Sequence, residues 1–257
     1  MSVLRLPRPE HWDSENRRLI WATIAFAVPI APFAYWGVVA TLRGHYLTAV
    51  VLLGLLVFPV LIALSLHLVA FGRTTVRATS DATGTTLRTA RLFSGAFFTG
   101  LAAFVVSGVL FIIYLPAGAL DIPVSRGWQI FSPILMAVAV VFAMIGLANG
   151  YRRGGLGYVE LSPTGVAVAN ILTTDSVGWS DVVDVKDNSG ATRTRKAVVL
   201  SSADGSEKVI DGADFYVPEG VPFYWMVRHY WLHSEDRAEL TDGRALKRLG
   251  DQRFDVT

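Results

Sequence analysis

The sequence predicts an α+β membrane protein, in which a bundle of four transmembrane helices precedes an antiparallel β-domain closed by a C-terminal helix. Three observations lead to this fold class. Hydrophobic residues make up 52% of the 257 positions, and charged residues only 17%. The first 150 residues hold four long uncharged stretches, and the rest of the chain alternates apolar and polar residues in short runs. This composition excludes a disordered chain, and the absence of cysteine excludes a disulfide scaffold.

The transmembrane domain is predicted over residues 19–150, with spans at 19–40, 47–71, 92–115 and 130–148. None of these spans contains Asp, Glu, Lys or Arg. Each is long enough, because a helix of about 20 residues crosses the hydrocarbon core. The first stretch is too long for the apolar part of a cleaved signal peptide, and acidic residues precede it, so we expect it to be retained. The lipid bilayer is therefore the first predicted partner.

The orientation of the spans follows from the basic residues that flank them. Ten lie in the N-terminal segment 1–18, in the second connection and after the fourth span: Arg5, Arg8, Arg17, Arg18, Arg73, Arg77, Arg88, Arg91, Arg152 and Arg153. The other two connections carry only Arg43 and Arg126. Because the cytoplasmic side carries the excess of Lys and Arg, we predict that both termini are cytoplasmic.

Polar chemistry is sparse within the spans. His67 is the one histidine inside them, about one turn from the cytoplasmic end. A single imidazole indicates a local structural role rather than an ion pathway or a pair of haem ligands. Pro29, Pro32 and Pro59 interrupt the first two spans and predict kinks, which either line a pathway or serve packing alone.

Small residues mark the third span. Gly95, Thr99, Ala103 and Ser107 recur every four residues, and Gly100 lies on an adjacent row. Small side chains at this spacing let helix backbones approach closely. We predict a helix-packing interface at these positions, formed either with the sister spans or with another subunit.

The second connection, residues 72–91, is longer than a tight turn. It contains seven threonines around Asp81-Ala82-Thr83-Gly84. Threonine favours strands, and Asp and Gly supply turn chemistry, so the segment is compatible with a short β-ribbon. A flexible basic loop is the alternative.

The C-terminal half predicts strands and a helix. Alternating runs at 158–161, 166–169, 182–185, 197–201 and 208–210 are typical of half-buried strands. Residues 223–240 contain no breaker and predict a helix of about five turns. The polar tail 241–257 is expected to be loosely ordered, with Leu246, Leu249 and Phe254 as docking points.

Two motifs carry a family resemblance. Residues 158–166 read Tyr-Val-Glu-Leu-Ser-Pro-Thr-Gly-Val, and residues 177–185 read Val-Gly-Trp-Ser-Asp-Val-Val-Asp-Val, before a Val-rich strand pair and a closing helix. Over about residues 155–240, this order resembles the bacterial pleckstrin-homology (PH)-like domain. The resemblance implies a partly open antiparallel barrel, capped by the C-terminal helix, that binds or assembles rather than catalyses. We interpret Trp179 as an anchor of its core.

The chain departs from the lipid-binding members of that family. Those members grip phosphates with basic residues around the first hairpin, whereas no Lys or Arg occurs from Gly154 to Val185. This argues against phosphoinositide recognition. The basic cluster Arg193, Arg195 and Lys196 remains a candidate contact for anionic lipid, with a solvated loop as the alternative.

Aromatic residues crowd the predicted helix 223–240. Phe223, Val227 and Tyr230 are expected to plug the barrel. Trp225, Arg228 and Leu232 then lie on another face, which predicts contact with the bilayer interface, the spans or a partner.

Candidate catalytic chemistry is weak. His229 and His233 have metal-ligand spacing, but Tyr230 stands where a metalloprotease needs its glutamate, and no cysteine is available. No nucleotide-binding glycine loop or nucleophile elbow occurs. We predict no catalytic residue, no metal and no cofactor.

These observations predict a non-enzymatic protein of the bacterial inner membrane. It is expected to act as an assembly, scaffold or accessory subunit, with a protein partner or self-association through the helices or the PH-like domain. The near balance of 23 basic and 21 acidic residues argues against a nucleic-acid partner. The alternative is transport or lipid handling through the Pro-kinked spans.

Overall fold

The structure is a computed structural model that describes residues 6–12, 15–170, 173–190 and 194–256, with the backbone alone for 15–22 and 24–29. The chain divides into two compact units. Unit 1 comprises Met1–Arg18, His67–Phe93 and Arg153–Thr257, and unit 2 comprises Leu19–Leu66 and Ser94–Arg152. The second connection therefore belongs with the C-terminal half, which the sequence did not predict.

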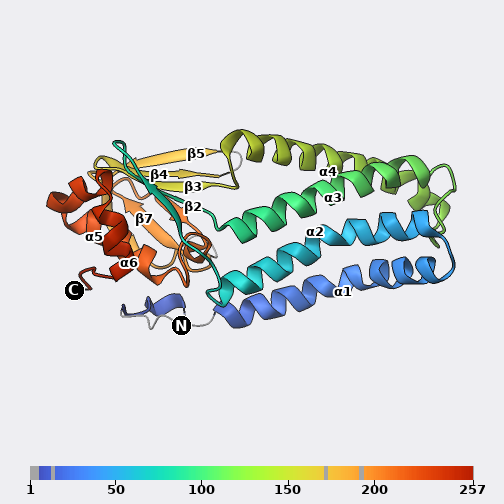
Figure 1. Ribbon diagram of the computed structural model, residues 1–257, viewed down its shortest axis with the longest axis horizontal. Helices are drawn as coiled ribbons and strands as arrows, with labels where there is room; N and C mark the ends of the chain where they lie inside the picture. Colours follow the sequence, from blue (N-terminus) through green and yellow to red (C-terminus); the bar gives the residue numbers. More distant parts are fainter. Residues whose placement is uncertain (1–5, 13–14, 171–172, 191–193, 257) are drawn as a thin grey trace. The chain divides into compact units, whose positions relative to one another are not determined.

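Unit 2 is built from helices (Figure 1). They are α1 (Glu15–Leu42), α2 (Tyr46–Ala70), α3 (Arg91–Tyr114) and α4 (Arg126–Arg153). Within the described residues, α2, α3 and α4 are each long and apolar enough to cross a membrane. The bounds of α1 enclose the first predicted span, and Ile30–Leu42 is the described apolar part of it.

Close approaches of small residues hold the helices of unit 2 together. A Cβ added at Gly54 of α2 would lie 2.0 Å from the Ser107 hydroxyl oxygen of α3. A Cβ at Gly108 of α3 would lie 2.6 Å from a methyl carbon of Val140 in α4. Such distances leave no room for a side chain, so these helices pack backbone to side chain.

Unit 1 contains two antiparallel sheets. The first has the order β1 (Arg77–Ser80), β2 (Thr85–Arg88), β3 (Tyr158–Leu161), β4 (Gly165–Ala169) and β5 (Thr174–Gly178), and the second has β6 (Val182–Lys186), β7 (Val198–Ser202) and β8 (Glu207–Ile210). The strands of the described chain thus form two antiparallel sheets, whereas the family resemblance implied one partly open barrel. β2 pairs with β3, so the second connection adds a hairpin to the edge of the C-terminal sheet (Figure 1).

Turn chemistry explains why the second connection forms a hairpin rather than a loop. The Asp81 carboxylate accepts hydrogen bonds from the backbone N–H of Thr83 (2.8 Å) and of Gly84 (3.3 Å). A Cβ at Gly84 would lie 2.4 Å from the Leu161 carbonyl oxygen, so only glycine fits against β3. The β-ribbon interpretation of residues 72–91 is therefore correct.

The core of unit 1 forms around α5 (Val221–Leu232). Phe223, Val227 and Tyr230 are fully buried, as the sequence predicted. Trp179 is buried as well, and its indole N–H donates to the Ser162 carbonyl (2.8 Å). A buried indole with a satisfied donor is the arrangement expected of a core anchor.

The C-terminal helix is shorter than predicted. α5 ends at Leu232, and Ser234–Thr241 forms a 3₁₀ helix (η3). The reason lies in Arg237, whose guanidinium donates to the carbonyls of Tyr230 (2.8 Å) and Trp231 (3.1 Å) at the end of α5. The side chain thereby caps carbonyls that a continuing helix would have satisfied.

The tail predicted to be loosely ordered is a helix, α6 (Arg244–Asp251). Leu249 and Phe254 are buried in the core of unit 1. Arg248 anchors the helix, because its guanidinium pairs with the carboxylates of Glu239 (2.7 Å) and Asp236 (3.3 Å). Charge pairing, which the sequence pattern did not reveal, orders this polar segment.

Candidate functional site

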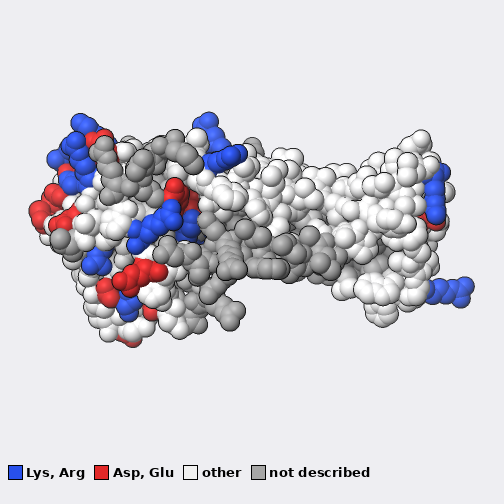
Figure 2. Space-filling model, turned by 90° about the horizontal axis from the view of Figure 1, so that it is seen from below, with Lys and Arg blue, Asp and Glu red and all other residues white. Residues whose placement is uncertain are grey.

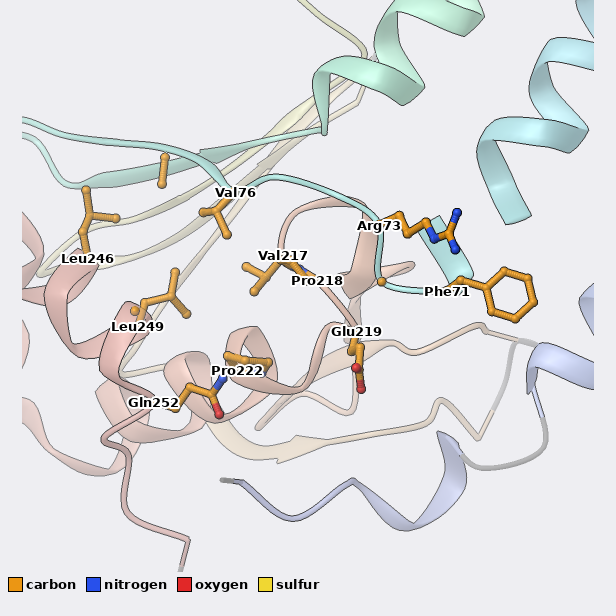
Figure 3. A pocket seen from close by; sticks show the side chains of 13 residues that line it. Phe71, Arg73, Val76, Val217, Pro218, Glu219, Pro222, Leu246, Leu249 and Gln252 are labelled. Carbon is orange, nitrogen blue, oxygen red and sulfur yellow. The ribbon is translucent and has the colours of Figure 1, made fainter. Parts of the chain in front are cut away.

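The described part of unit 1 contains a cavity of about 620 Å³. It lies between the chain that leaves α2, the loop before α5, and α6 (Figure 3). It is lined by Phe71, Gly72, Arg73, Val76, Ala78, Val217, Pro218, Glu219, Pro222, Leu246, Leu249, Gly250 and Gln252. Three segments that are far apart in sequence therefore build one site.

The loop between Val217 and Pro222 fixes one wall of this cavity. Glu219 and Gly220 both have positive φ, 63° and 81°. A Cβ at Gly220 would lie 2.9 Å from the Asp214 backbone nitrogen, so a side chain there would be both strained and obstructed. Pro218 and Pro222, on either side of these two residues, restrict the backbone of the loop further. This wall of the cavity therefore has little conformational freedom.

Most residues that line the cavity are apolar, and charged residues lie on one side of it. Figure 3 shows Leu246 and Leu249 of α6 facing Val76 and Val217, with Arg73 and Glu219 toward the other side. The Glu219 carboxylate pairs with Arg8 (3.2 Å). The lining holds no nucleophile beside a base, so what this arrangement offers is binding of an apolar group.

A second feature is the N-terminal strap, residues 6–12, which lies against α5. The Trp225 indole N–H donates to the Pro7 carbonyl (2.9 Å), and the Trp12 ring packs edge-on against Tyr224 at 5.9 Å. The Trp12 indole N–H in turn donates to the Asp187 carbonyl (3.0 Å). Unit 1 thus holds the strap, in which Glu10–Trp12 forms a 3₁₀ helix (η1), through aromatic contacts.

The strap corrects the predicted partner surface on the helix. Trp225 is buried, with 9% of its surface exposed, because the strap covers it. Arg228 stacks over the Trp225 ring (5.9 Å) and donates to the Val185 carbonyl (3.5 Å). Leu232 alone of the three stays open, at 45% exposed.

The structure also changes the interpretation of the basic cluster that was predicted to contact anionic lipid. Arg193 lies outside the described residues. Arg195 and Lys196 both pair with Asp214, which is fully buried, and the Lys196 amine is 3.2 Å from its carboxylate. Arg195 also stacks on the Phe215 ring at 5.0 Å. These two cations neutralise a buried carboxylate, which reduces their availability for a lipid phosphate.

The predicted small-residue interface divides into two sets. Gly100 and Ser107 are buried, and a Cβ at Gly100 would lie 2.8 Å from the Phe58 Cα of α2. Ala103 is half-buried, whereas Gly95 and Thr99 are exposed, and nothing lies within 4 Å of a Cβ at Gly95. The buried part packs against a sister helix within the chain.

His229 of α5 and His233, the residue that follows the helix, belong to a polar network. His229 Nε2 is 3.0 Å from Asp236, and its ring lies 4.6 Å from that of His233. Burial, reinforced by the charge of Arg248, lowers the pKa of His229. Burial also raises the pKa of Tyr230, which donates to Glu239 (3.2 Å). Among the described residues, no group of three or more His, Asp or Glu side chains could hold a metal ion.

Sequence reasoning missed both the cavity and the strap. Leu6 and Trp12 were the available signal for the strap, because they are apolar residues between the charged residues of the terminal segment. The run Val-Pro-Glu-Gly-Val-Pro at 217–222 signals a constrained loop. Neither pattern says which segment lies opposite, so the pairing with residues 71–78 could not be derived.

Comparisons with known proteins assign neither a family nor a function to the chain. The chain matches no protein-family model, no curated protein and no solved structure.

Proposed function

We propose that this chain is a four-span protein of the bacterial inner membrane whose unit 1 is a cytoplasmic PH-like module for assembly. In this role it is a scaffold or accessory subunit and not an enzyme. The observation that carries the proposal is the apolar cavity of unit 1, because its walls combine the chain leaving α2 with α6. A partner bound there would contact both the membrane helix connection and the C-terminal module.

The strap supports a fourth span. The strap contacts α5, so the chain before α1 lies on the same side of the membrane as the C-terminal half. α2 ends where unit 1 begins, so a membrane-crossing α2 starts on the opposite side. On this proposal the chain between Trp12 and Tyr46 would also cross the membrane, with α1 as the crossing helix.

Charge supports the cytoplasmic orientation. Of the ten basic residues counted on one side of the spans, all but Arg152 belong to the segments of unit 1. Arg43 and Arg126 flank the opposite ends of the helices. The positive-inside rule then favours unit 1 in the cytoplasm.

The PH-like interpretation draws support from the order of the elements. Antiparallel strands in two sheets precede α5, whose apolar residues fill the core of the unit. This is the order that the family resemblance implies, although the sheets are separate and the hairpin β1–β2 is an addition. Such a module supplies surfaces and clefts for binding, and the fold by itself fixes no chemistry.

Co-purification tests the proposal. Tagged full-length protein is extracted from its native membrane in mild detergent, and the intact mass of the assembly is measured. A stoichiometric protein partner is expected, and Leu246→Glu, which puts a charge into the cavity wall, is expected to release it. Val183→Glu, at an apolar residue of β6 that is 55% exposed and does not line the cavity, is the matched control. A partner retained by Leu246→Glu, or a chain without any partner, would contradict the assembly role.

A second candidate function is lipid handling or transport. It is favoured by an apolar cavity among the helices of unit 2, lined by residues of all four. Pro59 of α2 and Pro133 of α4 each remove one helix hydrogen bond from the bundle. Co-purified lipid without a protein partner would favour this function.

A further inference from the structure

The cavity of unit 2 points to a ligand that the assembly role does not require. Its volume is about 660 Å³. Its walls are apolar and include Phe33, Leu55, Phe104, Phe111, Leu135 and Met136. The connection between α3 and α4 contributes Ile122 and Val124 to the lining.

This connection is held firmly to the helices of unit 2. Leu115 and Leu120 of the connection are buried in a cluster with Val51 and Phe111. The backbone N–H of Asp121 donates to the hydroxyl oxygen of Thr48 in α2 (2.9 Å). The connection is thus held to the bundle by both apolar packing and a hydrogen bond, so the hollow beneath it is preformed.

The lining determines the class of the occupant. Among the lining residues that the structure describes, Ser125 and Ser132 are the only hydroxyl groups, and the Ser132 hydroxyl already donates to the Trp128 carbonyl (2.5 Å). Apolar cavities hold water poorly, because water needs polar partners. The walls belong largely to helices that are long and apolar enough to cross a membrane, so the available apolar groups are lipid acyl chains.

A second copy of this chain is a poorer occupant. Close packing between membrane helices relies on small residues. The glycines at 54, 100 and 108 are already occupied by contacts within the chain. The open part of the cavity lining instead presents Trp128 and Leu135, which are 60% and 61% exposed. Bulky side chains around a hollow suit a flexible chain better than a rigid helix.

The rim of the cavity favours an anionic head group. Arg126 is the first residue of α4, next to the lining residue Ser125, and forms no ion pair with any residue that the structure describes. The Arg43 guanidinium, by contrast, lies 4.0 Å from Asp121. The start of α4 also carries the positive end of the helix dipole. Trp128 lies on the same rim, as expected at the depth of lipid head groups.

We propose that this cavity binds one acyl chain of an anionic glycerophospholipid, with the phosphate beside Arg126. The lipid comes from the leaflet on the side of the membrane opposite unit 1, because α4 starts at that side. The binding site is independent of the assembly role, and it would serve either as a structural lipid site or as the entry to lipid handling.

Photolabelling tests the site. The full-length protein is reconstituted into vesicles of phosphatidylcholine that contain a phosphatidylglycerol analogue with a diazirine in one acyl chain, and labelled residues are mapped by mass spectrometry. Label is expected to concentrate on cavity residues such as Phe111, Met136 and Ala139. Label spread evenly over the lipid-facing sides of the helices would overturn the proposal, because it would mean only bulk lipid contact.

Two variants sharpen the test. Ala139→Phe fills the cavity and is expected to lose most of the cavity label, whereas Val138→Phe changes an exposed neighbour outside the lining and is expected to keep it. Arg126→Gln is expected to lower the preference for phosphatidylglycerol over phosphatidylcholine by about fivefold, since one cation near an anionic lipid contributes about that much. Unchanged label in a folded Ala139→Phe variant would contradict the site, and the wild-type map decides if that variant fails to fold.

Competition separates the sources of the ligand. Excess unlabelled phosphatidylglycerol is expected to remove the cavity label, and glycerol phosphate, which has the head group without the chain, is not. Displacement by glycerol phosphate would overturn the acyl-chain assignment. A dimeric intact mass together with absent cavity label would show that a second copy occupies the cavity.

Discussion

The two units are stabilised by different kinds of interaction. Unit 2 brings helices together where a glycine meets a neighbour, and its outer surface is large and apolar, with Phe131 and Phe142 at 66% and 70% exposed. Unit 1 buries its aromatic residues and also buries charge, such as Asp214. On the face shown in Figure 2, the described surface of the helices is almost free of charged residues except at the ends of the bundle. A surface of this kind suits lipid, which is as apolar as a protein interior.

This difference determines which kind of substitution destabilises each unit. Unit 1 depends on pairing among charged groups that its sheets and helices withdraw from water, and such a group is costly when its partner is lost. Unit 2 depends on shape, because burial in lipid gives its helices no hydrophobic reason to associate. Removal of a charge should therefore damage unit 1, and addition of volume should damage unit 2.

The largest expected effect is at Asp214. Asp214→Ala leaves Arg195 and Lys196, whose side chains are 19% and 9% exposed, without their common carboxylate. We expect a loss of about 3–5 kcal/mol in the free energy of unfolding of unit 1, the usual cost of breaking a buried pair. Denaturant unfolding of the purified protein, followed by tryptophan fluorescence, measures it.

Asp204→Ala is the matched control for this substitution. Asp204 caps the exposed turn between β7 and β8, where it accepts from the backbone N–H of Ser206 (2.9 Å). Its loss is expected to have a much smaller effect. Equal effects at the two positions would mean that burial of charge does not distinguish unit 1.

A smaller effect is expected from added volume in α3. Gly100→Leu would push against the Phe58 backbone and is expected to cost about 1–3 kcal/mol, as overpacking does. Gly95→Leu, on the same helix with open space around it, is expected to be tolerated. Thermal unfolding in detergent compares the stabilities of the two variants. Equal stabilities would contradict the close packing of small residues in α3.

The smallest effect concerns pH and His229. Its neighbours are Asp236 of η3, Arg248 of α6 and His233 at the end of α5, and burial is the main cause of its lowered pKa. The unfolded imidazole, with a pKa near 6.5, takes up protons while the folded one remains neutral. The stability of unit 1 should therefore fall as pH drops below about 6.5, by at most about 1.4 kcal/mol per pH unit. His229→Gln should flatten this dependence, and an unchanged pH profile would contradict it.

Periodicity and length were sufficient for the helices and most strands. The predicted spans at 47–71, 92–115 and 130–148 lie almost entirely within the bounds of α2, α3 and α4, because uncharged runs of that length are a strong local signal. The burial of Phe223 and Trp179 also followed from local pattern. These features are determined by residues that are close to one another in sequence, so a local pattern is enough to predict them.

Long-range pairing explains what the sequence could not predict. The end of α5 is fixed by Arg237, and the order of α6 by Arg248, through bonds to groups that are identified only after folding. Trp225 was expected to be open for a partner, but the strap, more than 200 residues away in sequence, covers it. Periodicity shows which side of a helix is apolar and does not identify what packs on it.

We propose that the strap and the C-terminal half lie together on the cytoplasmic side of four spans, and the accessibility of single cysteines tests this most directly. The chain has no native cysteine, so single-cysteine variants Glu10→Cys, Ser125→Cys and Ala203→Cys can be labelled with an impermeant thiol reagent. We predict that Ser125→Cys reacts in intact cells, and that Glu10→Cys and Ala203→Cys react only after lysis. Reaction of Ala203→Cys in intact cells would contradict the orientation, and opposite behaviour of Glu10→Cys and Ala203→Cys would contradict the fourth span.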